Sequence, residues 1–179
     1  MNDVIVLVGG TCSGKSTVEK MLRHRYGYCG IVKYTSRPKR EYEVNGQDYY
    51  FLDVKTFKKL LEEDYFVEWS VFKTDWYYGT AKHHYADNKI VVADPDGLRQ
   101  LRKEFGDEIT AFYLKEDERT RLKRMIDRGD DLMECFRRII SDQGILQGVE
   151  RDVNYTIDCT ELTVDAIAEQ VYGIIHRYM

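Results

Sequence analysis

Prolines and long apolar runs are scarce in this chain. Only 2 of its 179 residues are proline, and 43% are hydrophobic, which excludes a disordered or collagen-like chain. No apolar run approaches the ~18 residues that a membrane-spanning helix needs. At about 100–200 residues per domain, the sequence predicts one compact unit with a sizeable core and no membrane segment.

Paired cysteines are also missing, although the chain has 4 cysteines. Cys12, Cys29, Cys135 and Cys159 are widely scattered, without a CxxC pair or a histidine at the spacing of a zinc site. No secretion signal is visible. These observations favour free thiols over a disulfide framework and predict a cytoplasmic protein.

An excess of basic charge is missing as well. The chain has 27 basic and 31 acidic residues, a net charge of −4. A protein without a strongly basic field is a poor general binder of nucleic acids or membrane surfaces. The sequence therefore predicts neither a nucleic-acid partner nor a membrane partner.

What the chain does have is an alternation of short apolar runs with amphipathic segments. We expect strands at 4–8, 31–36, 65–72, 90–93, 109–114 and 155–158, and helices at 15–25, 54–63, 116–128 and 132–140. A last helix is expected from the helical spacing of Ile167, Val171, Ile174, Ile175 and Tyr178. Strands and helices in turn predict an α/β fold with a mostly parallel sheet. The tyrosine-rich stretch 37–80 has little buried-strand character and is interpreted as an inserted subdomain.

A phosphate-binding motif follows the first strand. Residues 9–16 are GGTCSGKS, which fits G-x-x-x-x-G-K-[ST] between a predicted strand and a predicted helix. In such a loop, backbone N–H groups surround a polyphosphate, the lysine reaches its β and γ oxygens, and the serine hydroxyl binds Mg²⁺. The alternative is a glycine turn with a solvated lysine. The motif predicts a nucleoside triphosphate but does not identify the reaction.

The ATP-binding residues predicted here are Gly9, Gly10, Thr11, Cys12, Ser13, Gly14, Lys15, Ser16 and Thr17, with Ser16 as the metal ligand. We call residues 9–16 the phosphate loop.

A second group of polar residues lies between 33 and 80. Residues 33–40, KYTSRPKR, hold four positive charges and no acidic residue. Several tyrosines and one carboxylate, Glu68, follow. Two arginines, tyrosine hydroxyls and one carboxylate suit a phosphate joined to a polar base. The alternative is a solvated basic face or a nuclear localisation signal, with the aromatic residues in the core.

In their order along the chain, these motifs resemble the guanylate kinase family. The family pattern T-T-R-x-P-R-x-G-E-x-N-G-x-D-Y-x-F, followed by F-x-E-W and Y-G-[ST], compares with TSRPKREYEVNGQDYYF at 35–51, FVEW at 66–69 and YGT at 78–80. The resemblance covers nearly the whole chain. It implies a three-layer α/β fold of the P-loop NTPase type, with a core at 1–36 and 81–179, a helical lid at about 125–145 and a GMP-binding subdomain at 37–80.

The same resemblance implies a Mg²⁺-dependent nucleoside monophosphate kinase of purine nucleotide metabolism that transfers a phosphoryl group from ATP to GMP, as a monomer or homodimer. Its implied GMP site, here called the monophosphate cluster, comprises Arg37, Arg40, Tyr49, Glu68, Tyr78, Thr80 and Asp94. The arginines and tyrosines would hold the phosphate, and Glu68 and Thr80 would read guanine.

Hydrogen-bond chemistry supports this reading of the base. Guanine presents N1–H and N2–H₂ side by side, and one carboxylate accepts both. A hydroxyl such as that of Thr80 donates to guanine O6, whereas adenine N1 is itself an acceptor that the Glu68 carboxylate repels.

Asp94 follows the strand expected at 90–93, where α/β sheets place their ligands. It matches the second aspartate of a family block L-D-I-D, which implies contact with Mg²⁺-bound water or a nucleotide hydroxyl. The alternative is a helix cap before Pro95.

Arginines on the helices expected at 116–128 and 132–140 form the last candidate group. Arg121, Arg124 and Arg128 share one helical face, and RMIDRG at 124–129 resembles the family's R-L-x-x-R-G before its lid. A third lid arginine lies at Arg137 or Arg138, with Arg138 as our candidate. The implied catalytic set is Lys15, Arg124, Arg128 and Arg138. The alternative for these arginines is an exposed, solvated face.

Some residues depart from the family pattern. Gly10, Thr11 and Cys12 replace P-S-G in the phosphate loop, Lys33 stands where a phosphate-binding serine is expected, and Val92 replaces the first aspartate of L-D-I-D.

Two other functions stay open. One is a related kinase for another small phosphorylated acceptor, such as a sugar phosphate, against which Glu68 and Thr80 argue. The other is a catalytically silent guanylate-kinase-like binding module, against which the intact Lys15 and Ser16 argue.

Overall fold

The computed structural model describes residues 4–72, 74–85 and 88–177. A five-stranded parallel sheet has the order β2-β7-β1-β8-β9. Its strands are β1 (Val4–Val8), β2 (Cys29–Gly30), β7 (Lys89–Val92), β8 (Ile109–Lys115) and β9 (Tyr155–Asp158). The central strand β1 is buried along its whole length, because its unbroken apolar sequence suits a strand covered on both faces.

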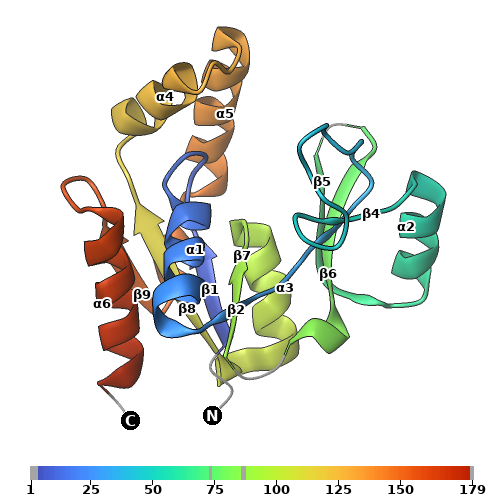
Figure 1. Cartoon of the computed structure of the whole chain (residues 1–179), viewed down its shortest axis with the longest axis horizontal. Helices are drawn as coiled ribbons and strands as arrows, with labels where there is room; N and C mark the ends of the chain where they lie inside the picture. Colours follow the sequence, from blue (N-terminus) through green and yellow to red (C-terminus); the bar gives the residue numbers. More distant parts are fainter. Residues whose placement is uncertain (1–3, 73, 86–87, 178–179) are drawn as a thin grey trace.

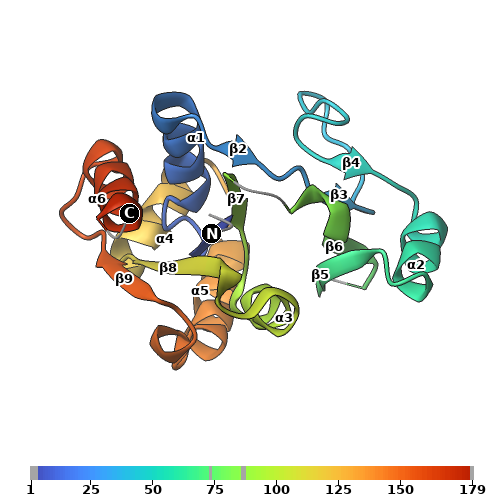
Figure 2. The same ribbon diagram turned by 90° about the horizontal axis from the view of Figure 1, so that it is seen from below.

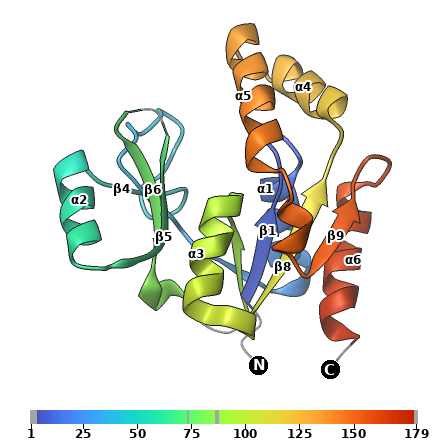
Figure 3. The same cartoon turned by 180° about the vertical axis from the view of Figure 1, so that it is seen from behind.

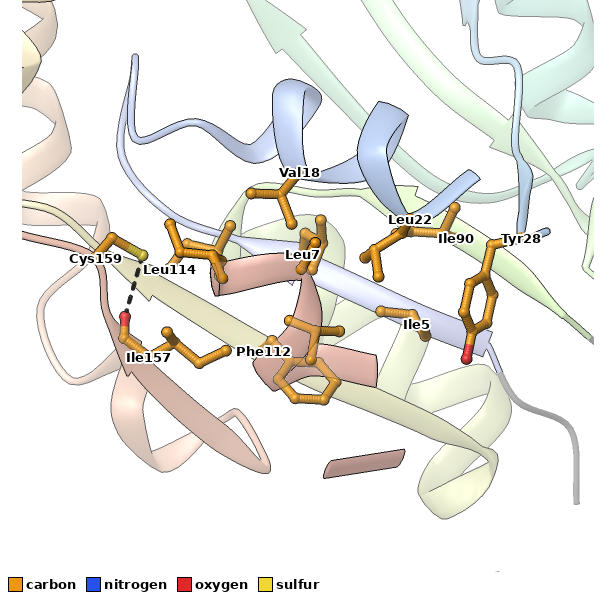
Figure 4. Packing of buried hydrophobic residues seen from close by; sticks show 13 residues of the cluster. Ile5, Leu7, Val18, Leu22, Tyr28, Ile90, Phe112, Leu114, Ile157 and Cys159 are labelled. Carbon is orange, nitrogen blue, oxygen red and sulfur yellow. Dashed lines mark hydrogen bonds between the residues drawn. The ribbon is translucent and has the colours of Figure 1, made fainter. Parts of the chain in front are cut away.

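Helices cover both faces of this sheet (Figure 2). α1 (Lys15–Tyr26) and α6 (Val164–His176) lie on one face, and α3 (Pro95–Phe105) lies on the other. Alternate residues of β1 face the two sides, so Ile5 and Leu7 pack against α1 and α6 while Val6 packs on the α3 side. Figure 4 shows the core on the α1 and α6 side. These three layers confirm the predicted fold class.

A second, four-stranded sheet has the order β4-β3-β6-β5. Its strands are β3 (Tyr34–Thr35), β4 (Tyr50–Phe51), β5 (Phe66–Phe72) and β6 (Trp76–Ala81). The helix α2 (Val54–Glu62) packs on this sheet through Phe57, whose ring stacks on Phe66 with 4.5 Å between centroids. Asp53 caps this helix and accepts the Thr56 N–H at 2.8 Å. Figures 1 and 3 show this sheet and α2 to one side of the core sheet.

Two further helices stand above the phosphate loop (Figure 1). They are α4 (Glu118–Asp127) and α5 (Leu132–Ile145), and the carboxylates of Asp117 and Asp131 cap their N-termini. Short 3₁₀ helices occupy Lys82–His84, Gly106–Glu108 and Val149–Arg151.

No helix among the described residues combines the length and the apolar character needed to span a bilayer.

Some sequence expectations about the elements were wrong. The strand expected at 31–36 is divided between the two sheets, because Ile31 bonds to Ile90 in the first sheet whereas the Lys33 carbonyl accepts from Tyr50 in the second. The strand β6 was not predicted. The helix expected at 116–128 begins only at Glu118, and α5 continues beyond 140 to Ile145. The expected helical position of Tyr178 lies outside the described residues.

Candidate functional site

The phosphate loop connects β1 with α1. Gly14 takes a left-handed backbone conformation, with φ of 95°, which glycine adopts without steric cost, and α1 begins at the next residue. The Lys15 ammonium donates to the carbonyl oxygens of Gly9 at 2.8 Å and Gly10 at 2.6 Å. The loop thus holds a cation beside a helix N-terminus, which is a suitable arrangement for a polyphosphate.

The surroundings of Lys15 also set its protonation. Burial lowers the pKa of the Lys15 ammonium to about 8, and the nearby charge of Asp142 offsets only part of that effect. Its hydrogen-bond partners are neutral carbonyls, which stabilise a positive charge less than a carboxylate does. An incoming phosphate would therefore raise the pKa of Lys15.

A buried ion pair links the phosphate loop to α4 and α5. Arg121 on α4 bonds Asp142 on α5, and the same carboxylate accepts the Thr11 backbone N–H at 2.6 Å. A Cβ atom at Gly10 would lie 2.1 Å from the Arg121 guanidinium, so a larger residue there would displace that side chain. The sequence analysis placed Arg121 on a helical face with Arg124 and Arg128; its side chain is in fact only 4% exposed.

A cavity of about 440 Å³ opens along the phosphate loop. Its lining comprises residues 11–18, the carboxylate of Glu116, the guanidinium-bearing Arg124, Arg128 and Arg138, and the apolar Leu162, Val164 and Ile167. Lys15 and the three candidate catalytic arginines therefore share one cavity. A lining with both cationic and apolar residues suits a nucleotide, which joins a flat base to a charged phosphate chain.

Arg124 is held in this cavity by two contacts. It pairs with the Glu116 carboxylate at 2.8 Å and donates to the Cys12 carbonyl at 3.1 Å. Glu116 is almost fully buried, with its side chain 1% exposed. The guanidinium of Arg124 thus lies directly at the phosphate loop.

Arg137 and Arg138 differ in where their guanidinium groups lie. Both bond to Glu134, at 2.7 and 2.9 Å, and together they lower the pKa of that carboxyl to about 2. Arg138 lines the cavity, whereas the Arg137 guanidinium lies 5.1 Å from the ring centroid of Phe72 on β5. The geometry favours Arg138 as the third lid arginine.

In the loop between β3 and β4, Glu43 holds the side chain of Arg37 and the backbone of Arg40. It accepts two hydrogen bonds from the buried Arg37 guanidinium, at 2.6 and 3.1 Å, and the Arg40 backbone N–H at 2.7 Å. The hydrogen bond from Arg37 contributes most to holding the pKa of the Glu43 carboxyl below its usual value, and the Arg40 N–H lowers it further. Arg37 lies 5.5 Å from the Tyr49 ring centroid, and the Tyr49 ring lies 6.0 Å from that of Tyr78. The phosphate-binding candidates therefore form one group, while the Arg40 side chain is exposed.

Glu68 on β5 is the buried carboxylate of the cluster, with 2% of its surface exposed. Its Oε1 accepts from the Thr80 hydroxyl at 2.9 Å and from the Lys33 ammonium at 2.7 Å. The hydroxyl groups of Thr80 and Tyr85 lie 2.7 Å apart. Because Thr80 gives its hydrogen to Glu68, the Tyr85 hydroxyl donates to Thr80. The hydrogen that the sequence analysis assigned to guanine O6 is directed at Glu68 here.

Lys33 was noted in the sequence only as a departure from the family pattern. Burial lowers the pKa of its ammonium, but the charge and the hydrogen bond of Glu68 outweigh that effect, so the pKa is raised. Lys33 therefore carries its charge within the cluster. It occupies the segment that crosses from one sheet to the other, where the Tyr50 N–H donates to its carbonyl at 2.8 Å.

Asp94 lies at the start of α3, within electrostatic range of both Lys15 and Lys33. It caps α3 by accepting the Gly97 N–H at 2.7 Å, which is the alternative that the sequence analysis named. A Cβ atom at Gly97 would lie 3.0 Å from Glu68 Oε2, so the start of α3 adjoins the buried carboxylate. The charge of Asp94 acts weakly on both lysines, on Lys15, whose pKa is lowered by burial, and on Lys33, whose pKa is raised chiefly by Glu68. Asp94 thus borders both the phosphate loop and the monophosphate cluster.

Sequence reasoning missed several residues of these sites. Glu43 lies within the motif at 35–51, so its position was visible although its role was not. Tyr85, Glu116 and Asp142 carry no local signal, since each acts on residues that only the fold brings near.

Comparisons with known proteins agree with this geometry. The family model described as guanylate kinase matches residues 1–178. The chain belongs to the guanylate kinase family. A guanylate kinase of Trichormus variabilis is 32% identical over 180 residues, covering 95% of this chain and 89% of that protein. One from Thermosynechococcus vestitus is 30% identical over 179 residues, covering 95% and 93%.

A solved structure has the same fold. The guanylate kinase of Anaplasma phagocytophilum superimposes with a TM-score of 0.75 at 18% identity, covering 99% of this chain and 86% of that one. The resemblance stated from the motifs is therefore confirmed, together with the fold class that it implies.

Proposed function

We propose that this chain transfers the γ-phosphoryl group of ATP to GMP, giving ADP and GDP. Membership of the guanylate kinase family supports this activity. The observation that carries it is the buried Glu68 carboxylate, hydrogen-bonded to Thr80 on the small sheet that also holds Tyr78 of the Arg37–Tyr49–Tyr78 group, in a chain whose phosphate loop is intact. A phosphate loop alone would fit any nucleoside triphosphatase.

ATP, the phosphoryl donor, would bind at the phosphate loop and the cavity beside it. Backbone N–H groups of residues 9–17 would surround the ATP phosphates, and the apolar wall at Leu162 and Val164 would take the adenine base. Lys15, Arg124, Arg128 and Arg138 would neutralise charge on the transferring group.

A magnesium ion fits this site as part of the nucleotide complex. The Ser16 hydroxyl is exposed at the start of α1, where phosphate-loop serines bind the ion. No three histidine, cysteine, aspartate or glutamate side chains among the described residues gather into a metal site of their own, in keeping with an ion that arrives with ATP. When bound, Mg²⁺ would neutralise the β and γ phosphate oxygens.

The nucleophile is a phosphate oxygen of GMP. A phosphomonoester has a second pKa near 6, so this oxygen is mostly ionised at neutral pH and needs no general base. The protein must bring two anions together in line. Arg37, Arg40, Tyr49 and Tyr78 would hold the GMP phosphate, and Asp94 would contact a nucleotide hydroxyl or water at the junction with the phosphate loop.

We further infer that residues 37–80 act as the monophosphate-binding subdomain, that 1–36 and 81–179 form the core, and that 125–145 act as the lid. The second sheet supports a separate subdomain here, although its strand β3 (Tyr34–Thr35) precedes residue 37. Closure of both parts would exclude water that competes as phosphoryl acceptor. Four free cysteines fit a cytoplasmic protein. We expect a monomer or homodimer.

ADP release tests this proposal across a panel of acceptors: GMP, dGMP, AMP, UMP, CMP and sugar phosphates. We expect turnover with GMP that exceeds AMP by at least about 10³-fold, because a site built for N–H donors rejects a base that lacks them. Activity restricted to a sugar phosphate or a pyrimidine nucleotide would overturn it. No turnover with any acceptor would leave a guanylate-kinase-like binding module.

A further inference from the structure

The Lys33–Glu68 pair places a hydrogen-bond donor and an acceptor side by side where the proposed function puts the base. Glu68 is buried and Lys33 is partly buried, with side chains 3% and 20% exposed. Among the described residues, the Lys33 ammonium has one hydrogen-bond partner, Glu68 Oε1 at 2.7 Å. Since an ammonium carries several N–H donors, Lys33 keeps donors for a ligand.

The two oxygens of Glu68 are not equivalent. Oε1 already accepts from Lys33 and from Thr80. Oε2 lies on the side of α3, 3.0 Å from the position of a Cβ at Gly97. One carboxylate oxygen is therefore left for a base, whereas full recognition of N1–H and the 2-amino group of guanine uses both.

The group expected to read O6 is also committed. Thr80 donates its hydrogen to Glu68 Oε1 and accepts from Tyr85. Lys33 donates to the same Oε1, so its ammonium lies on the Thr80 side of the carboxylate. Under the proposed function, this is the side that faces O6 of the base.

We propose that Lys33 reads the 6-oxo group of the base while Glu68 Oε2 accepts its N1–H, so that the site takes 6-oxopurine monophosphates as a class and uses IMP nearly as well as GMP. This inference rests on the proposed function, which supplies the orientation of the base. The 2-amino group of guanine, absent from hypoxanthine, adds little. Adenine is rejected because its 6-amino group meets an ammonium and its N1 meets a carboxylate.

The kcat/KM values for GMP, IMP and AMP test this assignment in four proteins: wild type, Lys33→Ser, Lys33→Met and the control Lys55→Ser on the exposed face of α2. Wild type should prefer GMP over IMP by less than about 10-fold. Lys33→Ser frees Oε1 to accept N1–H, which lets Oε2 accept the 2-amino group of guanine, so this preference should rise by about 10-fold or more. Lys33→Met should lower the GMP-to-AMP ratio by about 10- to 100-fold, and Lys55→Ser should change neither ratio.

Each ratio is taken within one protein, so partial unfolding of a variant cancels. The assignment is overturned if wild type prefers GMP over IMP by more than about 100-fold and both Lys33 variants keep the wild-type ratios. A wild type without turnover on any of the three nucleotides would refute the proposed function instead. Titration calorimetry then gives the dissociation constants of GMP, IMP and AMP for wild type and Lys33→Ser. The GMP-to-IMP and GMP-to-AMP ratios of these constants test the base preference without turnover.

Discussion

The phosphate loop and the monophosphate cluster each hold a partly buried lysine, but they hold it differently. Lys15 donates to two neutral backbone carbonyls, at 2.8 and 2.6 Å, and burial lowers its pKa to about 8. Lys33 donates to a carboxylate at 2.7 Å, which outweighs burial and raises its pKa. A cation held by neutral groups exchanges them readily for phosphate, whereas a cation paired with a carboxylate is already neutralised. The first lysine is ready for an anion, and the second suits a neutral base.

The same contrast extends to the arginines. Arg37 of the monophosphate cluster is committed to Glu43 through two hydrogen bonds and is buried. Arg124 and Arg138 also have carboxylate partners, but their guanidinium groups line an open cavity. The cluster is thus preorganised before its ligand arrives, whereas the cationic groups at the loop are positioned to rearrange around a polyphosphate.

Removing Lys15 should have the largest effect. Lys15→Ala should lower kcat by about 10²–10³-fold, the usual cost of losing one donor to the transferring group, while the fold persists because the lysine bonds only to loop carbonyls. Steady-state ADP release measures this, with circular dichroism to check folding. Lys20→Ala, an exposed position on the same helix, is the matched control. Equal turnover of Lys15→Ala and Lys20→Ala would remove the catalytic role of the phosphate loop.

Breaking the Lys33–Glu68 pair should come next. Glu68→Gln leaves a partly buried ammonium without its counter-charge. The expected cost is about 2–3 kcal/mol of unfolding free energy, less than for a fully buried pair because the lysine keeps some solvation. Urea denaturation measures this. The double variant Glu68→Gln/Lys33→Met should regain most of the loss. A double variant as unstable as Glu68→Gln alone would mean that the ion pair is not the source of the effect.

Replacing Gly10 by alanine should weaken ATP binding moderately. Gly10→Ala places a Cβ 2.1 Å from the Arg121 guanidinium, so the Arg121–Asp142–Thr11 contacts must shift and ATP affinity should fall by about 10-fold, or 1.4 kcal/mol. Titration calorimetry measures the affinity. Gly173→Ala in α6, where a Cβ meets nothing within 4 Å, should instead stabilise the fold by about 0.5–1 kcal/mol. Unchanged ATP affinity in Gly10→Ala would show that the loop does not need its link to α5.

The smallest predicted effect is the uptake of protons when ATP binds. Because the pKa of free Lys15 is about 8 and phosphate raises it, ATP binding should take up a fraction of a proton around pH 8–9, and affinity should weaken as the pH rises through this window. GMP binding should take up none there, since Lys33 stays charged. Calorimetry in buffers of different ionisation enthalpy separates the two. Equal proton uptake with both nucleotides would contradict the stated difference in protonation between Lys15 and Lys33.

Much of the fold was predictable because local patterns decide it. The buried run of β1, the loop motif behind it and the Asp53 cap of α2 each depend on neighbours in the sequence. The break within 31–36 was not predictable, since nothing local tells a chain that its hydrogen-bond partners change from one sheet to another. The Asp142 contact with Thr11 spans 131 residues, and no spacing rule connects them.

The candidate site shows the same limit. Motifs located Lys15, Arg37 and Glu68, but a motif cannot state which partner each side chain meets. Thr80 illustrates this, because its hydrogen is engaged by Glu68 once Tyr85 and Lys33 join the same network. The sequence shows Lys33 as a departure from the family pattern. Its role in the site became evident only from its contact with the Glu68 carboxylate.

Phosphorus-31 nuclear magnetic resonance of the protein with MgATP and GMP tests the central claim most directly. The account predicts that the GMP signal declines while the α and β signals of GDP grow in equal amount, matched by loss of the ATP γ signal. An unchanged GMP signal while ATP is converted to ADP and inorganic phosphate would contradict it, because the γ-phosphoryl group would then pass to water and not to the nucleotide.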